Sequence, residues 1–352
     1  MDERNARVIG LDQGDRFSHL CVLNAEGAVV LRDRVRTTRE AYRRRFAAWP
    51  GCRVVLEVGT HSPWSSRLLG ELGLEVVVAN PRRVKLISQA ERKTDRVDAE
   101  TLARLGRVDP QLLAPIRHGS EAMQRDRASL RLREGLVRSR TRLIQQARGV
   151  CKALGAPLPA CSAGSFARRM KNAAELALVP GMARFIEEIE QLCAAIRAFD
   201  RDVEHACAQR HPVTAQLRQV AGVGPITALA YVVTLEDPTR FAKSREVGPF
   251  LGLVPRAHSS GERQPELGIP HRGDVLLRRC LVQAAHYVLG PFGPDTELRR
   301  VGLAIAARGG QRAKKRAVIA VARRLAVLLH RLWVTGETYQ PIGYRHRAAR
   351  AA

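Results

Sequence analysis

Short apolar runs alternate with helical sequence through the first hundred positions. Five of these runs are rich in β-branched residues, end at turn residues such as Gly14 and Gly27, and are therefore expected to be strands; they are 7–12, 19–24, 28–35, 53–58 and 74–80. Helices are expected at 38–49, at about 62–72 and from about 82 to 106. The order βββαβαβα predicts a mixed α/β fold with helices packed on one sheet.

From about residue 120 to 205, strand signals give way to charged helical sequence. One series of apolar residues recurs every seven positions, and a second steps alternately by four and three; these are Met123, Leu130, Val137, Ile144 and Cys151, then Phe185, Ile189, Leu192, Ile196, Phe199 and Val203. Such heptad seams predict two long helices, joined through the Pro/Gly/Ser-rich stretch 155–164. An antiparallel hairpin and an intermolecular coiled coil both satisfy the pattern.

A third region begins near residue 212 and is mostly helical. In LRQVAGVGPITALAYVVTL, Gly222 and Gly224 are separated by one residue between two apolar helical stretches. This is the pattern of a helix-hairpin-helix, whose turn amides can hold a DNA phosphate, although a plain helix turn has the same appearance. Another helix is expected from about 274, and ARGGQRAKKR at 307–316 is expected to be a flexible basic segment that contacts nucleic acid through Lys314 and Lys315.

The length of 352 residues favours more than one domain. The change of character along the chain predicts an α/β domain at 1–112, a helical linker at 113–211, a C-terminal domain at 212–340 and a basic tail at 341–352.

The charge is strongly unbalanced. Apolar residues make up 45% and charged residues 26%, which is ordinary for a folded protein, yet 59 Lys plus Arg against 34 Asp plus Glu give a net charge of +25. An excess of this size favours nucleic acid as partner over an acidic metabolite. Aromatic residues are only 5%, so base stacking on an aromatic platform is not the expected mode of binding.

The seven cysteines are scattered without a C-x-x-C pair, which excludes a zinc ribbon and a disulfide framework. The charged N-terminus is not expected to be a signal peptide. Arg323 and Arg324 interrupt the longest apolar stretch near the C-terminus, so no membrane span is expected. The predicted location is a reducing cytoplasm.

Four acidic residues are candidates for metal binding. Asp12 and Glu57 each end an apolar strand, and Asp95 and Asp98 lie three apart in KTDRVDAETLA, on one side of a helix. Carboxylates converging at one edge of the sheet could hold two divalent metals for attack on a phosphodiester, and an oxygen-only donor set suits Mg²⁺ or Mn²⁺. Surface or capping roles for each acid are the alternative.

Three stretches together resemble a known family. VIGLDQGDRFSHLCVLN, LEVGTHSPWSSRLLGELGLEVVVANPRRVK and KTDRVDAETLARL resemble the N-terminal DEDD domain of the insertion-sequence one-ten (IS110) family transposases, which include the Piv-type DNA invertases. The stretch from VAGVGPITALAYVV to GLVPRAHSSGERQPELG and onward resembles their C-terminal transposase domain. The resemblance covers roughly residues 7–106 and 215–290.

This resemblance implies a RuvC-like ribonuclease H domain, a coiled-coil linker used to assemble a dimer or tetramer, and a domain with a catalytic serine. It implies transposition of a mobile element by DNA recombination, with sites chosen by a noncoding bridge RNA. The catalytic and metal-binding acids would be Asp12, Glu57, Asp95 and Asp98. The nucleophile would be Ser260, which directly precedes Gly261, or its neighbour Ser259.

The sequence departs from the family pattern just after these serines. Family members carry a Gly-Lys-rich run and a Thr-Lys-x-Gly there, whereas this chain has GERQPELG and IPHRGD. Phosphate contacts could still come from nearby arginines; these are Arg263, Arg272, Arg278 and Arg279. Two alternatives to a recombinase are a Holliday-junction-type metal-dependent endonuclease, in which the serine is idle, and an inactive nucleic-acid-binding relic.

Overall fold

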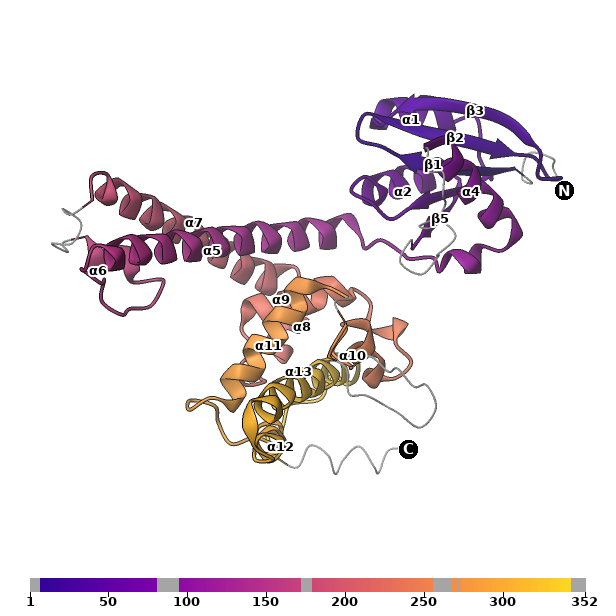
Figure 1. Ribbon diagram of the computed structural model, residues 1–352. Coiled ribbons are helices and arrows are strands. Elements are labelled where there is room, and N and C mark those ends of the chain that lie inside the picture. Colours follow the sequence, from indigo (N-terminus) through magenta and orange to yellow (C-terminus); the bar gives the residue numbers. More distant parts are fainter. Residues whose placement is uncertain (1–6, 81–94, 172–178, 256–267, 271–272, 343–352) are drawn as a thin grey trace. The chain divides into compact units, whose positions relative to one another are not determined.

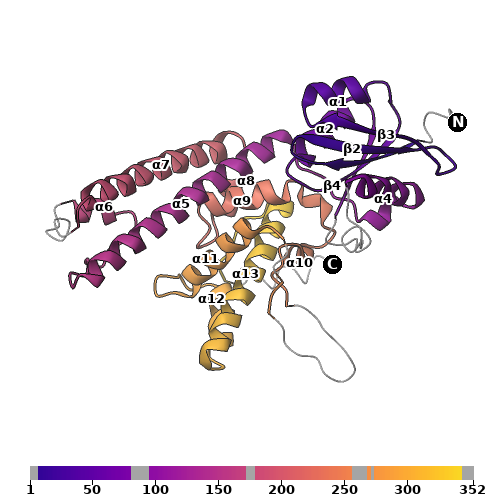
Figure 2. The ribbon, with the colours of Figure 1, turned by 45° about the horizontal axis from the view of Figure 1, so that its top comes forward.

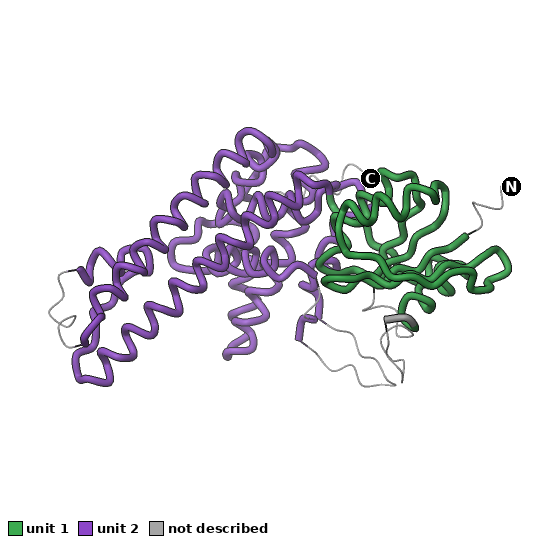
Figure 3. Tube along the Cα trace, turned by 90° about the horizontal axis from the view of Figure 1, so that it is seen from above, with its two compact units in different colours: residues 1–119 green, residues 120–352 purple. Residues whose placement is uncertain are grey.

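The computed structural model describes residues 7–80, 95–171, 179–255, 268–270 and 273–342, with positions 95 and 96 described by their backbone alone. The chain divides into two compact units, residues 1–119 and 120–352 (Figure 3). Each unit has its own hydrophobic cores and is described by itself.

Five strands form the sheet of the first unit, in the spatial order β3-β2-β1-β4-β5. They are β1 (Val8–Gln13), β2 (Phe17–Leu23), β3 (Val29–Arg36), β4 (Arg53–Glu57) and β5 (Glu75–Ala79). The first three strands pair antiparallel, whereas β4 lies parallel to both β1 and β5. The predicted mixed α/β class is confirmed, and each strand is within two residues of its expected bounds.

Helices cover both faces of this sheet. α1 (Arg39–Phe46) and α2 (Ser62–Glu71) lie on one face, and α4 (Asp95–Val108), followed by the short η1 (Pro110–Leu113), lies on the other. Alternate strand residues supply the two cores: Leu11 packs with Tyr42 of α1, while Val8 packs with Leu102 of α4. The helical sequence expected from residue 82 lies outside the described residues up to position 94.

Two long helices pack side by side in the second unit (Figures 1 and 2). They are α5 (Glu121–Ala153) and α7 (Met182–Gln209), and the short α6 (Phe166–Met170) packs against α7 near its start. The chain therefore pairs its own two heptad helices, as the hairpin alternative expected.

The buried seam of α7 differs in phase from the one expected. Ile189 and Ile196 are buried as predicted. Phe185 and Leu192, which were also expected to be buried, are only half-buried. Their neighbours Ile186 and Cys193 are buried instead. The reason is the additional partner, because Phe166 and Met170 of α6 share a core with the first half of α7 and widen its buried face.

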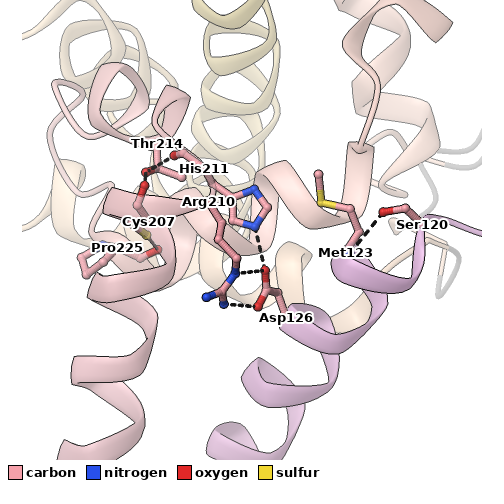
Figure 4. A network of polar contacts seen from close by, with 8 residues as sticks. All are labelled: Ser120, Met123, Asp126, Cys207, Arg210, His211, Thr214 and Pro225. Atoms are coloured by element: carbon pink, nitrogen blue, oxygen red, sulfur yellow. Dashed lines mark hydrogen bonds and ion pairs between the residues drawn. The ribbon is translucent and has the colours of Figure 1, made fainter.

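A buried carboxylate connects the start of α5 to the end of α7 (Figure 4). Asp126 accepts hydrogen bonds from Arg210 at 2.5 and 3.3 Å, and its other contact is the Nε2 atom of His211 at 2.7 Å. Burial alone would raise the pKa of Asp126, but the hydrogen bonds from Arg210 and His211 hold it below its ordinary value. The ionised side chain thus ties the base of the hairpin to the helices that follow.

The remaining helices gather around one large core, to which Leu130 of α5 and Val203 of α7 also contribute. Tyr231 is buried there and donates a hydrogen bond to the carbonyl oxygen of Ala326 at 2.6 Å. The helices are α8 (Val213–Leu217), α9 (Pro225–Leu235), η3 (Pro238–Arg240), η4 (Ser244–Glu246), α10 (Val247–Phe250), α11 (Val275–Leu289), α12 (Glu297–Ala306) and α13 (Gly310–Thr335). This core contains residues on both sides of the predicted boundary between the helical linker (113–211) and the C-terminal domain (212–340). That boundary stays a prediction.

The expectation of a flexible segment at 307–316 was wrong. α13 begins at Gly310, and Lys314 and Lys315 are exposed on its first two turns while Ala313 and Ala317 are buried. The two glycines at 309 and 310 mark a helix start with φ of +91° and +71° rather than a flexible loop. Among the described helices, none is both long and apolar enough to cross a membrane.

Candidate active site

Asp12 and Glu57 lie next to each other at one edge of the sheet. β1 and β4 are parallel, and their register pairs Leu11 with Leu56, so the two acids occupy the next position on each strand. Both side chains are half-buried. Asp12 shares a face with Gly10 because alternate strand residues point the same way, and this is the face on which α4 packs.

α4 approaches the backbone of β1 very closely. A Cβ atom on Gly10 would lie 1.9 Å from the carbonyl oxygen of Ala99, so only glycine permits this packing. Towards the end of α4, Arg107 donates a hydrogen bond to the carbonyl oxygen of Ala25, in the turn between β2 and β3. α4 therefore starts near the sheet edge that carries Asp12 and runs toward the opposite edge.

The remaining two acids belong to the first turn of α4, since the helix begins at Asp95 and Asp98 is half-buried directly before Ala99. The structure thus brings the helix end with Asp95 and Asp98 to the strand ends with Asp12 and Glu57. For Asp95 only the backbone is described. Among the described side chains, no group of three or more His, Cys, Asp or Glu residues is gathered closely enough to hold a metal ion.

A buried hydrogen-bond network supports this edge from the opposite face of the sheet. The Oη atom of Tyr42 lies 2.6 Å from the Oγ atom of Ser18 and accepts a hydrogen bond from Gln13 at 3.0 Å, and Gln13 in turn accepts one from Ser65. Burial raises the pKa of Tyr42, against the effect of these hydrogen bonds, and the charge of Asp12 adds to the rise. These residues were not sequence candidates, because they come from four different elements and only Gln13 adjoins a predicted acid.

Ser62 fixes the main chain directly after Glu57. Its Oγ atom accepts a hydrogen bond from the Gly59 amide and donates one to the Gly59 carbonyl, both at 2.9 Å. The same oxygen lies 2.8 Å from the Nε2 atom of His118. The turn between β4 and α2 is therefore held rigidly beside the acidic edge.

In the second unit, the two glycines of the predicted DNA-binding turn have different surroundings. α8, the turn and α9 follow one another as expected. Gly222 has φ of +84°, and a Cβ atom there would lie 2.9 Å from the carbonyl oxygen of Ala284, so packing alone requires glycine. Gly224 precedes α9 with φ of −85° and has no atom within 4 Å of an added Cβ. Of these two glycines, only Gly224 has open space beside it, directly before α9.

The serine-bearing segment lies outside the described residues. Ser259, Ser260 and Arg263 fall in 256–267, and Arg272 falls in 271–272. Beyond it, Asp274 caps α11 by accepting a hydrogen bond from the Leu277 amide at 2.8 Å. Burial would raise the pKa of Asp274, but this amide and the guanidinium of Arg127 lower it.

Other predicted contacts to nucleic acid lie within the described residues; these are Arg278, Arg279, Lys314 and Lys315. Arg278 donates a hydrogen bond to the carbonyl oxygen of Leu251 at 3.2 Å, so it fastens α11 to the end of α10. Lys314 and Lys315 are exposed on α13.

Comparison with known proteins gives consistent results for both ends of the chain. A DEDD-type transposase family model matches residues 9–154, and a model described as "Transposase IS116/IS110/IS902 family" matches residues 214–297. The transposase for insertion sequence element IS1328 of Yersinia enterocolitica is 30% identical over 287 residues, covering 80% of this chain and 83% of that protein. The transposase for insertion sequence element IS1111A of Coxiella burnetii is 29% identical over 348 residues, covering 96% and 92%.

Proposed function

Because the chain belongs to the IS110 family of insertion-sequence transposases, and is thus a DNA-recombining enzyme, we propose that it exchanges DNA strands through metal-assisted attack by a serine at sites chosen by a noncoding bridge RNA. The observation that carries the proposal is the meeting of the start of α4 with the ends of β1 and β4. This arrangement brings the strand ends that carry Asp12 and Glu57 to the helix start that carries Asp95 and Asp98, which supports a shared acidic site. The strand order also supports a RuvC-like ribonuclease H fold.

The donor set fits an oxygen-preferring divalent cation. Asp12, Glu57, Asp95 and Asp98 would hold it, and carboxylates without histidine or cysteine suit Mg²⁺ or Mn²⁺. When bound, such an ion polarises a phosphodiester and favours deprotonation of a hydroxyl group. The tight contact of Gly10 with Ala99 and the rigid turn at Ser62 would hold these carboxylates in place.

In the covalent step, the Oγ atom of Ser260, or of Ser259, forms a bond to phosphorus while one phosphorus–oxygen bond of the DNA strand breaks. The serine proton leaves to a base, and the departing DNA oxygen takes up a proton to become a free hydroxyl. Attack by another strand's hydroxyl reverses the step and restores a phosphodiester. Exchange therefore needs no external energy source.

Assembly through the helical linker is part of the same proposal. Leu132 of α5 is 63% exposed, and Leu154, the residue that caps the end of α5, is 56% exposed. Contact with a second copy of the chain would remove apolar surface of this kind from water, which is favourable. A dimer or tetramer is the expected state, to be measured by light scattering on the full chain.

An in-cell junction assay tests the function. The gene and its native non-coding ends are placed between reporters, and excised or inserted junctions are amplified for wild type, Asp12→Asn, Ser259→Ala and Ser260→Ala. Asp15→Asn is the matched control, because this neighbouring acid is 98% exposed. We expect junctions to disappear in Asp12→Asn and in one serine variant and to persist in the control.

The alternatives give different results in that assay. Junctions that survive both serine changes would contradict covalent attack and leave a metal-dependent endonuclease of the Holliday-junction type. Loss of junctions on deletion of the non-coding ends, with the protein still expressed, supports direction by RNA encoded there. Wild type that binds DNA but forms no junctions with its native ends would indicate an inactive relic.

A further inference from the structure

α5 is far more basic than a helix that only connects two domains needs to be. It carries nine basic and three acidic residues. All three acids are already ion-paired: Glu121 with Arg125, Asp126 with Arg210, and Glu134 with Arg279 of α11. The excess positive charge of α5 is therefore not neutralised by its own acids.

Two adjoining cavities lie along this helix. The first, of about 500 Å³, is formed by α5 and the start of α11, and its charged lining includes Arg127, Arg131, Arg138 and Asp274. The second, of about 630 Å³, lies between α5, α11 and the turn before α9. Together they are called the α5–α11 groove here.

The second cavity continues the arginine lining of the first. Arg133 and Arg140 of α5 face it together with Gly224. The ion pair between Glu134 and Arg279 lines both cavities and so joins them. In all, six arginines and two acids line the groove.

Some of these arginines are fixed and others are available. Arg127 binds Asp274 at 2.5 Å, and the Asp274 side chain is only 6% exposed. Arg131 is 62% exposed and 3.6 Å from Asp274, and Arg138 is 67% exposed and 3.9 Å from Glu134. Long, exposed ion pairs contribute little stability, so these two guanidinium groups can turn to an incoming anion at small cost.

Arg140, which lines the second cavity, has a buried donor without a partner among the described residues. The buried Nε atom of Arg140 makes no hydrogen bond among the described residues, although its Nη1 atom contacts the Sγ atom of Cys193 at 3.8 Å. A buried donor without an acceptor is unfavourable unless a ligand supplies one.

We propose that the α5–α11 groove binds the phosphodiester backbone of a nucleic-acid strand, with Arg131 and Arg138 as direct phosphate contacts. Arginine presents a planar fork of donors that matches phosphate oxygens. The two residues are seven positions apart, about 10.5 Å along the helix, so they reach different phosphates. The inference rests on the proposed function for the identity of the partner, which is nucleic acid. It assigns part of the nucleic-acid-binding surface to α5, in the helical linker.

Binding by a charge-matched pair of variants tests this assignment. Arg131→Gln with Arg138→Gln removes two charges from the groove, and Arg125→Gln with Arg142→Gln removes two exposed charges from α5 outside both cavities. Fluorescence anisotropy of the full chain is measured against duplex DNA, single-stranded DNA and RNA of one sequence, from low to moderate salt. Circular dichroism melts establish that both double variants fold.

We call Arg131→Gln with Arg138→Gln the groove variant, and Arg125→Gln with Arg142→Gln the control variant. For one of the three probes, we expect the affinity of the groove variant to be at least tenfold lower than that of the control variant. Its slope of log affinity against log salt should fall by about 1.5, since each lost phosphate contact removes roughly 0.7 to 0.9. The probe with the larger loss identifies DNA or RNA as the occupant. Equal losses in the two variants on all probes would overturn the proposal and leave only a general effect of charge.

The junction assay separates this inference from the proposed function. If wild type forms junctions while the groove and control variants bind alike, the groove assignment fails and the recombinase stands. If the groove variant alone loses binding while wild type forms no junctions, the groove stands and the proposed function fails.

Discussion

Replacing Gly10 with alanine should separate the two halves of the acidic site without touching any acid. The added Cβ atom would meet the carbonyl oxygen of Ala99 at 1.9 Å. Carbon atoms of this kind are not found closer than about 3.0 Å, so α4 must retreat from β1 by at least about 1.1 Å. Because α4 begins with Asp95 and Asp98, this displacement changes their distance from Asp12 and Glu57.

Two effects follow from this displacement. Overpacking of this size costs about 1–3 kcal/mol of unfolding free energy. A misplacement of about 1 Å in a catalytic arrangement can lower the rate by roughly a hundredfold. The loss of activity should therefore greatly exceed what a modest loss of folded protein explains.

Gly106→Ala is the matched control on the same helix. Gly106 lies eight residues along α4 from Asp98. Its added Cβ atom would meet a side-chain methyl group of Val55 at 2.2 Å, whereas the added Cβ atom at Gly10 would meet the backbone. Thermal melting gives the stability of each variant, and the junction assay at a temperature where both are folded gives the activity. We expect both variants to melt lower than wild type, with junctions nearly absent only in Gly10→Ala.

Either of two results would refute this reasoning. If Gly10→Ala has the same melting temperature and junction yield as wild type, α4 does not lie against β1 as described. Equal loss of junctions in both variants, in proportion to their stability, would mean that the first turn of α4 has no positional role in the reaction.

Three other predictions use different parts of the second unit. The carboxylate of Asp126 has a pKa below its ordinary value, so its ionised form stabilises the fold fully above about pH 4. This stabilisation is lost as the pH falls through the native pKa. In urea denaturation, Asp126→Asn should cost about 2 kcal/mol at pH 7, and the cost should decrease as the pH is lowered through the native pKa. Burial raises the pKa of Cys280 to about 11, so its alkylation at pH 8, followed by mass spectrometry, should be on the order of a hundredfold slower than that of an ordinary thiol. Gly222→Ala should lower the melting temperature by several degrees, whereas Gly224→Ala should melt nearly like wild type and weaken DNA binding if the turn amides hold a phosphate.

The acidic edge could be anticipated because its determinants are local in the sequence. Asp12 and Glu57 each follow a run of apolar residues, and parallel strands bring such ends to one edge. Gly10 within a strand is also a local signal, since glycine there marks a close approach of another backbone. The supporting contacts of Tyr42 with Ser18 and Gln13 have no such signal, because they depend on how α1 meets the sheet.

Errors arose where a second partner decides which face of a helix is buried. A heptad pattern gives the phase of a helix that packs on one neighbour, whereas α7 packs on both α5 and α6 and buries Ile186 and Cys193. The glycines at 309 and 310 suggested flexibility, but burial of Ala313 and Ala317 against the core keeps the basic residues that follow on a helix.

The α5–α11 groove shows why charge composition alone does not locate a binding surface. An arginine-rich heptad helix ordinarily has a solvated charged face, and nothing near Arg131 in the sequence distinguishes it from Arg125. The distinction comes from Asp274 and Glu134, acids that would be expected to weaken a site for phosphate. Asp274 holds Arg127 and Glu134 holds Arg279, so these acids fix the two sides of the groove while Arg131 remains exposed between them. These acids lower the net charge but hold Arg127 and Arg279 in place, which leaves Arg131 and Arg138 as the guanidinium groups that can turn to a phosphate. This placement exists only after residues 145 and 147 positions apart have packed together.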